Sequence, residues 1–201
     1  MTFRILSIAV LSILLCGVLT RGLAELCRLH FTVVSIAAAA PYAALVATRS
    51  ASPLLDSLSV LAVGAVAGTL LASIVRTRQT LFAFAIAAAV VDVISFIAGP
   101  THQLLTGPKQ VWMLRLLAVT TTHFAVIGIG DLLLFACMAT ALNHIGLRWI
   151  PALGAPAVGL LVAVFVGIHT SGLPAVPFLS AATIAACLLS ARSHPPIRTS
   201  S

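Results

Sequence analysis

The sequence predicts an all-α fold, a polytopic transmembrane bundle of about seven helices. Three observations predict it. Hydrophobic residues make up 61% of the chain and charged residues only 7%, against about 25% charged residues in an average soluble domain. The hydrophobic residues gather in runs long enough to cross a bilayer, which takes ~20 residues. The 11 basic residues stand mainly between these runs, where basic side chains flank membrane helices and set their orientation.

The first three runs predict the N-terminal helices. Residues 3–20 also resemble a signal peptide, but no small-x-small cleavage site closes the run, so it is expected to remain as a helix. The second helix, 31–47, contains Pro41, which predicts a kink. The third, 55–75, contains Gly64 and Gly68, a spacing that permits close approach of a neighbouring helix.

Four further runs predict the rest of the bundle. Gly-Pro pairs at 99–100 and 107–108 mark a loop after the first of them. The polar end of the chain, 190–201, is expected to be a disordered tail, so that 1–189 forms one transmembrane domain. The four expected helices cover 80–99, 116–142, 150–168 and 173–189.

Basic residues predict the orientation of the bundle. With seven helices, four basic residues fall on one side and seven on the other, and the more basic side is expected to be cytoplasmic. This places the C-terminus in the cytoplasm. The smaller set is Arg4, Arg49, Lys109 and Arg115, and the larger set is Arg21, Arg28, Arg76, Arg78, Arg148, Arg192 and Arg198.

The same composition disfavours several function classes. The net charge of +7 comes from dispersed flanking residues, without the basic cluster that grips phosphates, so no nucleic-acid partner is expected. The four cysteines form no CxxC pair, and the six histidines show no HExxH pattern. The sequence therefore predicts neither a metal site nor an organic cofactor.

Two aspartates carry the main chemical signal. The chain has four acidic residues, and two of them, Asp92 and Asp131, lie inside membrane-length apolar runs on consecutive expected helices. A carboxylate at the membrane centre costs about 2.5–3.5 kcal/mol on insertion scales, and such residues normally face the bundle interior and mark function. We therefore expect Asp92 and Asp131 to face each other.

Paired carboxylates suit hydrolysis. Two carboxyl groups held close share one proton, so one can take a proton from water while the other polarises a carbonyl. Gly128 and Gly130 precede Asp131, and the sequence predicts that Gly128 lies on roughly the same helix face and lets a backbone approach.

These residues resemble a known motif. Gly128-Ile129-Gly130-Asp131 is similar to the GxGD motif of the intramembrane aspartyl proteases, the presenilin and signal peptide peptidase family. The resemblance covers about 80–189 and implies a presenilin-like catalytic half with Asp92 and Asp131 as the catalytic pair, although Val91 stands where that family has tyrosine. It also implies a Pro-Ala-Leu motif, for which the chain offers two segments. Pro151-Ala152-Leu153 matches the letters, whereas Pro174-Ala175-Val176 opens the last helix, where the family has the motif, and is preferred.

The resulting hypothesis is an intramembrane aspartic endopeptidase. The resemblance implies that Gly128, Gly130, Pro174, Ala175 and Val176 bind a transmembrane-helix or signal-peptide substrate within the lipid bilayer, with no cofactor. The expected orientation resembles signal peptide peptidase rather than presenilin. A small proton- or ion-coupled transporter explains the two aspartates equally well. An inactive relative that only binds membrane helices is a third possibility, and the sequence leaves the oligomeric state open.

Overall fold

The fold consists of six described helices and one pair of short strands. A computed structural model of the chain describes residues 2–29, 53–97, 113–114, 127–169 and 173–193. Strand β1 (Met113–Leu114) pairs antiparallel with β2 (Ile127–Gly128), with Met113 opposite Gly128. The all-α prediction is confirmed for this part of the chain. The helices are α1 (Thr2–Leu29), α3 (Pro53–Ala72), α4 (Arg78–Ile97), α6 (Ile129–His144), α7 (Trp149–His169) and α8 (Val176–Ser193).

These helices coincide with six of the seven expected spans, with changes at the ends. The helix α1 runs nine residues beyond the expected end at residue 20, because the following Arg, Leu, Ala and Glu residues are good helix formers. The first residues of the expected tail, 190–193, belong to α8. The second expected span 31–47, the Gly-Pro loop at 99–108 and the tail residues 194–201 lie outside the described residues.

The predicted start of the fifth helix is wrong. The run 116–142 was expected to be one helix, but α6 begins only at Ile129, and Gly128 before it is extended, with φ −73° and ψ 158°. Residues 115–126 lie outside the described part. Glycine has low helix propensity, and a carboxylate is favourable in a first helical turn, so two glycines followed by Asp131 form a helix start. Asp131 therefore lies in the first turn of a helix and not in its middle.

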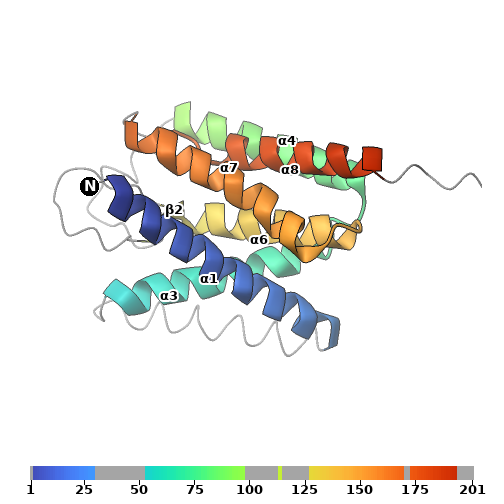
Figure 1. Cartoon of the computed structure of the whole chain (residues 1–201), viewed down its shortest axis with the longest axis horizontal. Coiled ribbons are helices and arrows are strands. Elements are labelled where there is room, and N and C mark those ends of the chain that lie inside the picture. The colour runs from blue at the N-terminus through green and yellow to red at the C-terminus, as the bar shows by residue number, and fades with distance from the viewer. Residues whose placement is uncertain (1, 30–52, 98–112, 115–126, 170–172, 194–201) are drawn as a thin grey trace, which may run out of the picture.

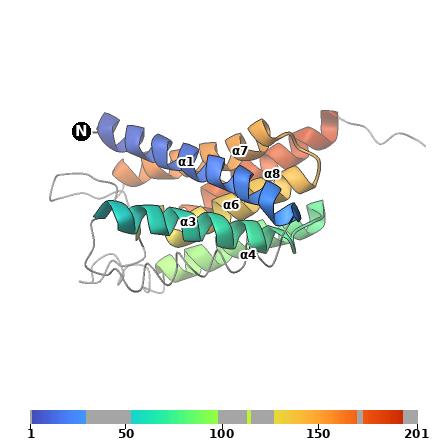
Figure 2. The same cartoon turned by 90° about the horizontal axis from the view of Figure 1, so that it is seen from below.

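The helix α6 forms the centre of the bundle. Its buried residues cover all sides, which is typical of a helix enclosed by others. The helix α3 packs against α6 most extensively, α7 and α8 pack against each other, and α4 is held mainly by α8 (Figures 1 and 2). The buried side chains of α6 are Leu132, Phe135, Ala136, Cys137, Met138, Ala139, Thr140, Ala141 and Leu142.

Two tight turns join the described helices at one end of the bundle. Thr77 and Thr80 exchange hydrogen bonds at the start of α4, since the Thr77 hydroxyl accepts from the Thr80 N–H and the Thr80 hydroxyl accepts from the Thr77 N–H, each at 3.1 Å. Between α6 and α7, Gly146 has φ +102°, a conformation that other residues rarely adopt. Both turns therefore reverse the chain at the end where α1 and α8 finish (Figure 1).

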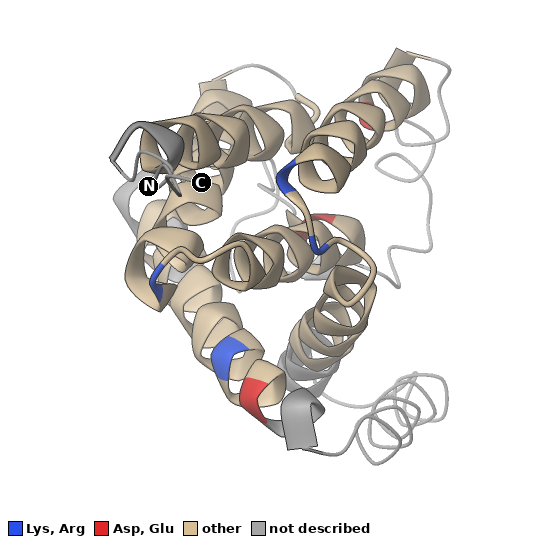
Figure 3. Cartoon of the chain, turned by 90° about the vertical axis from the view of Figure 1, so that its right-hand side faces the viewer, with Lys and Arg blue, Asp and Glu red and all other residues tan. Residues whose placement is uncertain are grey.

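Arginines gather at this same end. Arg21 near the end of α1, Arg76 and Arg78 between α3 and α4, and Arg148 between α6 and α7 are all exposed there (Figure 3). These four belong to the larger basic set that the sequence predicts for one side. We refer to this end of the bundle as the arginine end.

Two of the described helices, α4 and α7, are long and apolar enough to span a membrane. Much of their outer surface is hydrophobic. Six large apolar residues of α4 are exposed, and Ile97 and Ile150 are 77% and 84% exposed. In water such a surface is unusual for a monomer. The exposed residues of α4 are Ile86, Val90, Val91, Val93, Ile94 and Ile97.

Candidate functional site

Asp131 is fixed by the start of its own helix. The residue is partly buried in the first turn of α6, and its carboxylate accepts a hydrogen bond of 2.9 Å from the Gly128 N–H. This contact satisfies one of the backbone donors that a helix N-terminus leaves free. Glycine has no side chain to return the bond, so only this half of a capping box is present. The N-terminal end of the α6 dipole further stabilises a negative charge at Asp131.

Asp92 is fixed by the start of another helix. It is partly buried in the second half of α4, and its carboxylate accepts a hydrogen bond of 3.1 Å from the N–H of Val176, the first residue of α8. The Ser180 hydroxyl forms a second link between these helices by donating to the Ala85 carbonyl oxygen at 2.9 Å. Each aspartate thus accepts a hydrogen bond from a backbone N–H at a helix start.

The two aspartates lie at one level of the bundle. Counted along their helices at ~1.5 Å per residue, Asp92 is about 21 Å from Arg78, and Asp131 is about 20 Å from His144, and both Arg78 and His144 lie at the arginine end. The helices α4 and α6 are in contact, and the Asp92 charge acts on the Asp131 carboxyl. The structure therefore brings Asp92, Asp131 and the start of α8 to the same region of the bundle.

The segment Pro174-Ala175-Val176 adjoins Asp92. Leu173 and Pro174 are not helical, and α8 begins at Val176, so this start supplies the N–H that Asp92 accepts. The other candidate, Pro151-Ala152-Leu153, lies in the first turns of α7, directly after the turn at the arginine end. It is thus separated from Asp131 by most of the length of α6. The preference for Pro174-Ala175-Val176 agrees with this arrangement.

The two glycines before Asp131 lie in different surroundings, and Gly128 is not on the helix face that the sequence predicts. Gly128 was expected on the same helix face as Asp131, but it precedes the helix, in β2, and a methyl group there would lie 3.4 Å from an Asp131 carboxylate oxygen. Its observed contribution is an N–H donor and not a surface for helix packing. Gly130 is exposed, and no described atom lies within 4 Å of the position its side chain would take. Position 130 itself is therefore open to a neighbouring backbone, as far as the described residues show.

Residues that sequence reasoning missed hold these helices in place. A methyl group at Gly159 of α7 would lie 2.6 Å from the Phe178 carbonyl oxygen and 2.7 Å from the Leu179 Cα, so glycine lets α7 approach the start of α8. Ser180 links α8 to α4. A lone glycine and a lone serine are common in membrane helices, and no spacing in the sequence indicated the contacts they make.

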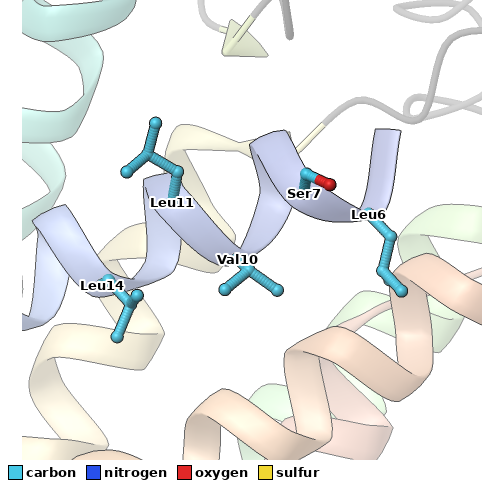
Figure 4. A pocket seen from close by; sticks show the side chains of 5 residues that line it. All are labelled: Leu6, Ser7, Val10, Leu11 and Leu14. Carbon is cyan, nitrogen blue, oxygen red and sulfur yellow. The ribbon is translucent and has the colours of Figure 1, made fainter. Parts of the chain in front are cut away.

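The other candidate sites offer fewer reactive or metal-binding side chains. An apolar pocket on α1 is lined by five residues of that helix and by neither aspartate (Figure 4). Among the described residues, no three His, Cys, Asp or Glu side chains gather as a metal site would require. Cys16, Cys137 and Cys187 are buried as free thiols, as small apolar side chains commonly are. The pocket residues are Leu6, Ser7, Val10, Leu11 and Leu14.

The chain was also compared with known protein families, curated proteins and solved structures. No protein-family model matches the chain, and neither curated proteins nor solved structures give a match. The functional interpretation therefore depends on the residues and the geometry of this chain.

Proposed function

We propose that the chain is an intramembrane aspartic endopeptidase whose reacting groups are the Asp92 and Asp131 carboxyls. The observation that carries the proposal is the contact between the Val176 N–H and the Asp92 carboxylate, near Asp131. It links three segments that the sequence singles out: the aspartate of α4, the Gly128–Asp131 motif and the Pro174–Val176 segment.

The proposed reaction needs one proton shared by the two carboxyls. The carboxylate takes a proton from water as the water oxygen attacks the scissile carbonyl carbon, and the protonated partner donates to the carbonyl oxygen. The resulting tetrahedral diol collapses when a proton passes to the amide nitrogen and the C–N bond breaks, leaving a carboxylate and an amine. Backbone N–H donors at Gly128 and Val176 hold the two carboxyls during these steps.

The proposed substrate is a transmembrane helix that unwinds locally, because a helix shields its peptide bonds and satisfies its own backbone groups. Extended backbone on the protein offers such a segment partners. The strand β2 ends at Gly128, three residues before Asp131, and the non-helical residues before Val176 lie beside Asp92. Strand addition to backbone of this kind is a recurrent mode of peptide recognition.

The proposal also covers the number of membrane spans and the arrangement of the catalytic half. A bundle of about seven spans, with a presenilin-like catalytic half over about 80–189, follows from the resemblance of Gly128–Asp131 to the GxGD motif. The exposed apolar surfaces of α4 and α7 support a location in lipid. If the arginine end marks one border of a hydrocarbon core ~30 Å thick, both aspartates lie about 10 Å inside the opposite border.

The orientation is proposed from the arginine end. Arg21, Arg76, Arg78 and Arg148 gather where α8 ends, so this end and the C-terminus are expected in the cytoplasm. In a cysteine-free background, Gln79→Cys at this end is expected to react with a membrane-impermeant maleimide only after right-side-out vesicles are opened. Ile97→Cys, at the opposite end of α4, should react in sealed vesicles. The reverse pattern would place the arginine end outside.

Purified chain tests the proposed activity. We expect it to cleave a model single-span substrate in detergent, and a peptide with a hydroxyl group that mimics the tetrahedral diol should block cleavage. The reconstituted chain should carry no ions across liposomes. Ion-dependent uptake without cleavage would instead identify the transporter that the two aspartates also permit. Substrate binding without either activity would identify an inactive relative.

A further inference from the structure

Two glycines of α3 let this helix pack closely against the first turn of α6, which contains Asp131. Gly64 and Gly68, four residues apart, lie on one face of α3. A methyl group at Gly64 would lie 2.9 Å from the Leu132 Cβ, 3.4 Å from the Leu133 nitrogen and 3.5 Å from the Ile129 carbonyl oxygen. The first turn of α6 is therefore in close contact with the α3 backbone.

The contact at Gly68 is tighter still. A methyl group there would overlap the Leu133 carbonyl oxygen and would lie 2.7 Å from the Ala136 Cβ and 2.9 Å from the Cys137 nitrogen. Two of these three atoms belong to the backbone of α6, and backbone atoms cannot turn away as a side chain can. Any side chain at position 68 therefore requires α6 to move away from α3.

A movement of α6 away from α3 would displace Asp131. At ~100° per residue, the contacted residues Ile129, Leu132, Leu133 and Ala136 centre on the face of α6 roughly opposite Asp131. The helix α3 thus contacts the face of this turn that is opposite Asp131, and the Asp92 charge acts on Asp131. A shift of α6 away from α3 carries Asp131 with it and changes its separation from Asp92.

From this geometry we propose that Gly64 and Gly68 are positioning residues, which set the separation of the two carboxyls through the spacing of α3 and α6. Interaxial distances follow the side chains at the contact, and glycine permits the shortest ones. The inference rests on the proposed function for its effect on catalysis, since a misplacement of ~1 Å can cost on the order of 10²-fold in rate. The spacing itself is a property of the fold and is testable without activity.

Three alanine variants test the catalytic part. Gly68→Ala is expected to lower kcat by roughly 10-fold or more and to leave KM within about twofold, because the shift changes the carboxyl geometry and not the docking of substrate. Gly64→Ala, which meets a milder contact, should lower kcat less. Gly154→Ala is the matched control, since no described atom lies within 4 Å of the added methyl group. The proposal would be overturned if Gly68→Ala left kcat unchanged, or if this variant raised KM without lowering kcat.

Crosslinking tests the spacing without proteolysis. In a background without Cys16, Cys27, Cys137 and Cys187, a chain with Asp92→Cys and Asp131→Cys is treated with bifunctional maleimides of graded length. Adding Gly68→Ala should change the minimum crosslinker length that joins positions 92 and 131, whereas adding Gly154→Ala should leave this length unchanged. If Gly68→Ala does not fold, Gly64→Ala takes its place in both assays. Identical crosslinking in all chains overturns the inference, and a changed pattern without any cleavage contradicts only the proposed function.

Discussion

Replacing either Asp92 or Asp131 by asparagine is expected to lower the cleavage rate on the order of 10³-fold, and replacing both should cost little more. In the proposed mechanism the two carboxyls share one proton and act as a unit, and residues acting as a unit are strongly non-additive. The measurement is kcat for a model single-span substrate with each single variant and the double variant.

Asparagine separates catalysis from folding at these positions. Its side-chain oxygen still accepts the N–H of Gly128 or Val176, so each helix start keeps its hydrogen bond. Asparagine also removes the penalty on ionising two carboxyls held close together, so the thermal unfolding temperature in detergent should stay the same or rise. Losses in the two single variants that multiply in the double variant would contradict a shared proton. Activity in Asp131→Asn close to that of the parent chain would end the protease proposal, and Asp131 would then be a helix cap.

Val176→Pro is the second change with a large expected effect. Proline is tolerated at the first position of a helix, where the backbone N–H has no partner within the helix. In this chain that N–H donates to Asp92, and proline removes it. A hydrogen bond to a charged group contributes about 1.5–3 kcal/mol, so kcat should fall roughly 10- to 100-fold.

The control for this change is Val176→Ala. It removes two methyl groups from a side chain that is 4% exposed but keeps the N–H. Both variants should lose some thermal stability through lost packing, and only Val176→Pro should lose most of the cleavage rate. Equal kcat values for the two would show that the hydrogen bond from Val176 to Asp92 contributes nothing to the reaction.

The sequence predicted most of the described helices. Apolar runs and their flanking arginines were enough to locate α3, α4, α7 and α8 within a few residues, because length and hydrophobicity are local properties. The choice of Pro174-Ala175-Val176 over Pro151-Ala152-Leu153 followed from its position before the last helix, and the structure brings the chosen segment to Asp92.

The start of α6 was missed for a physical reason. Hydropathy does not distinguish an apolar helix from an apolar strand, so residues 127–128 appeared to continue one long span. The helix start depends on Gly128, Gly130 and Asp131 acting together, with the carboxylate accepting the Gly128 N–H. These are interactions between specific neighbouring groups, which average hydrophobicity along a run does not report.

By itself, the sequence determined the α-helical class, the apolar surfaces and the two acids most suited to chemistry, because these follow from the kind and order of the residues. Only the tertiary structure decided which backbone groups meet these acids. The donors at Val176, 84 residues from Asp92, and the close fit of Gly68 against Leu133 depend on how helices pack. Helix packing is set by side-chain shape at contacts between distant segments, and no local pattern records it.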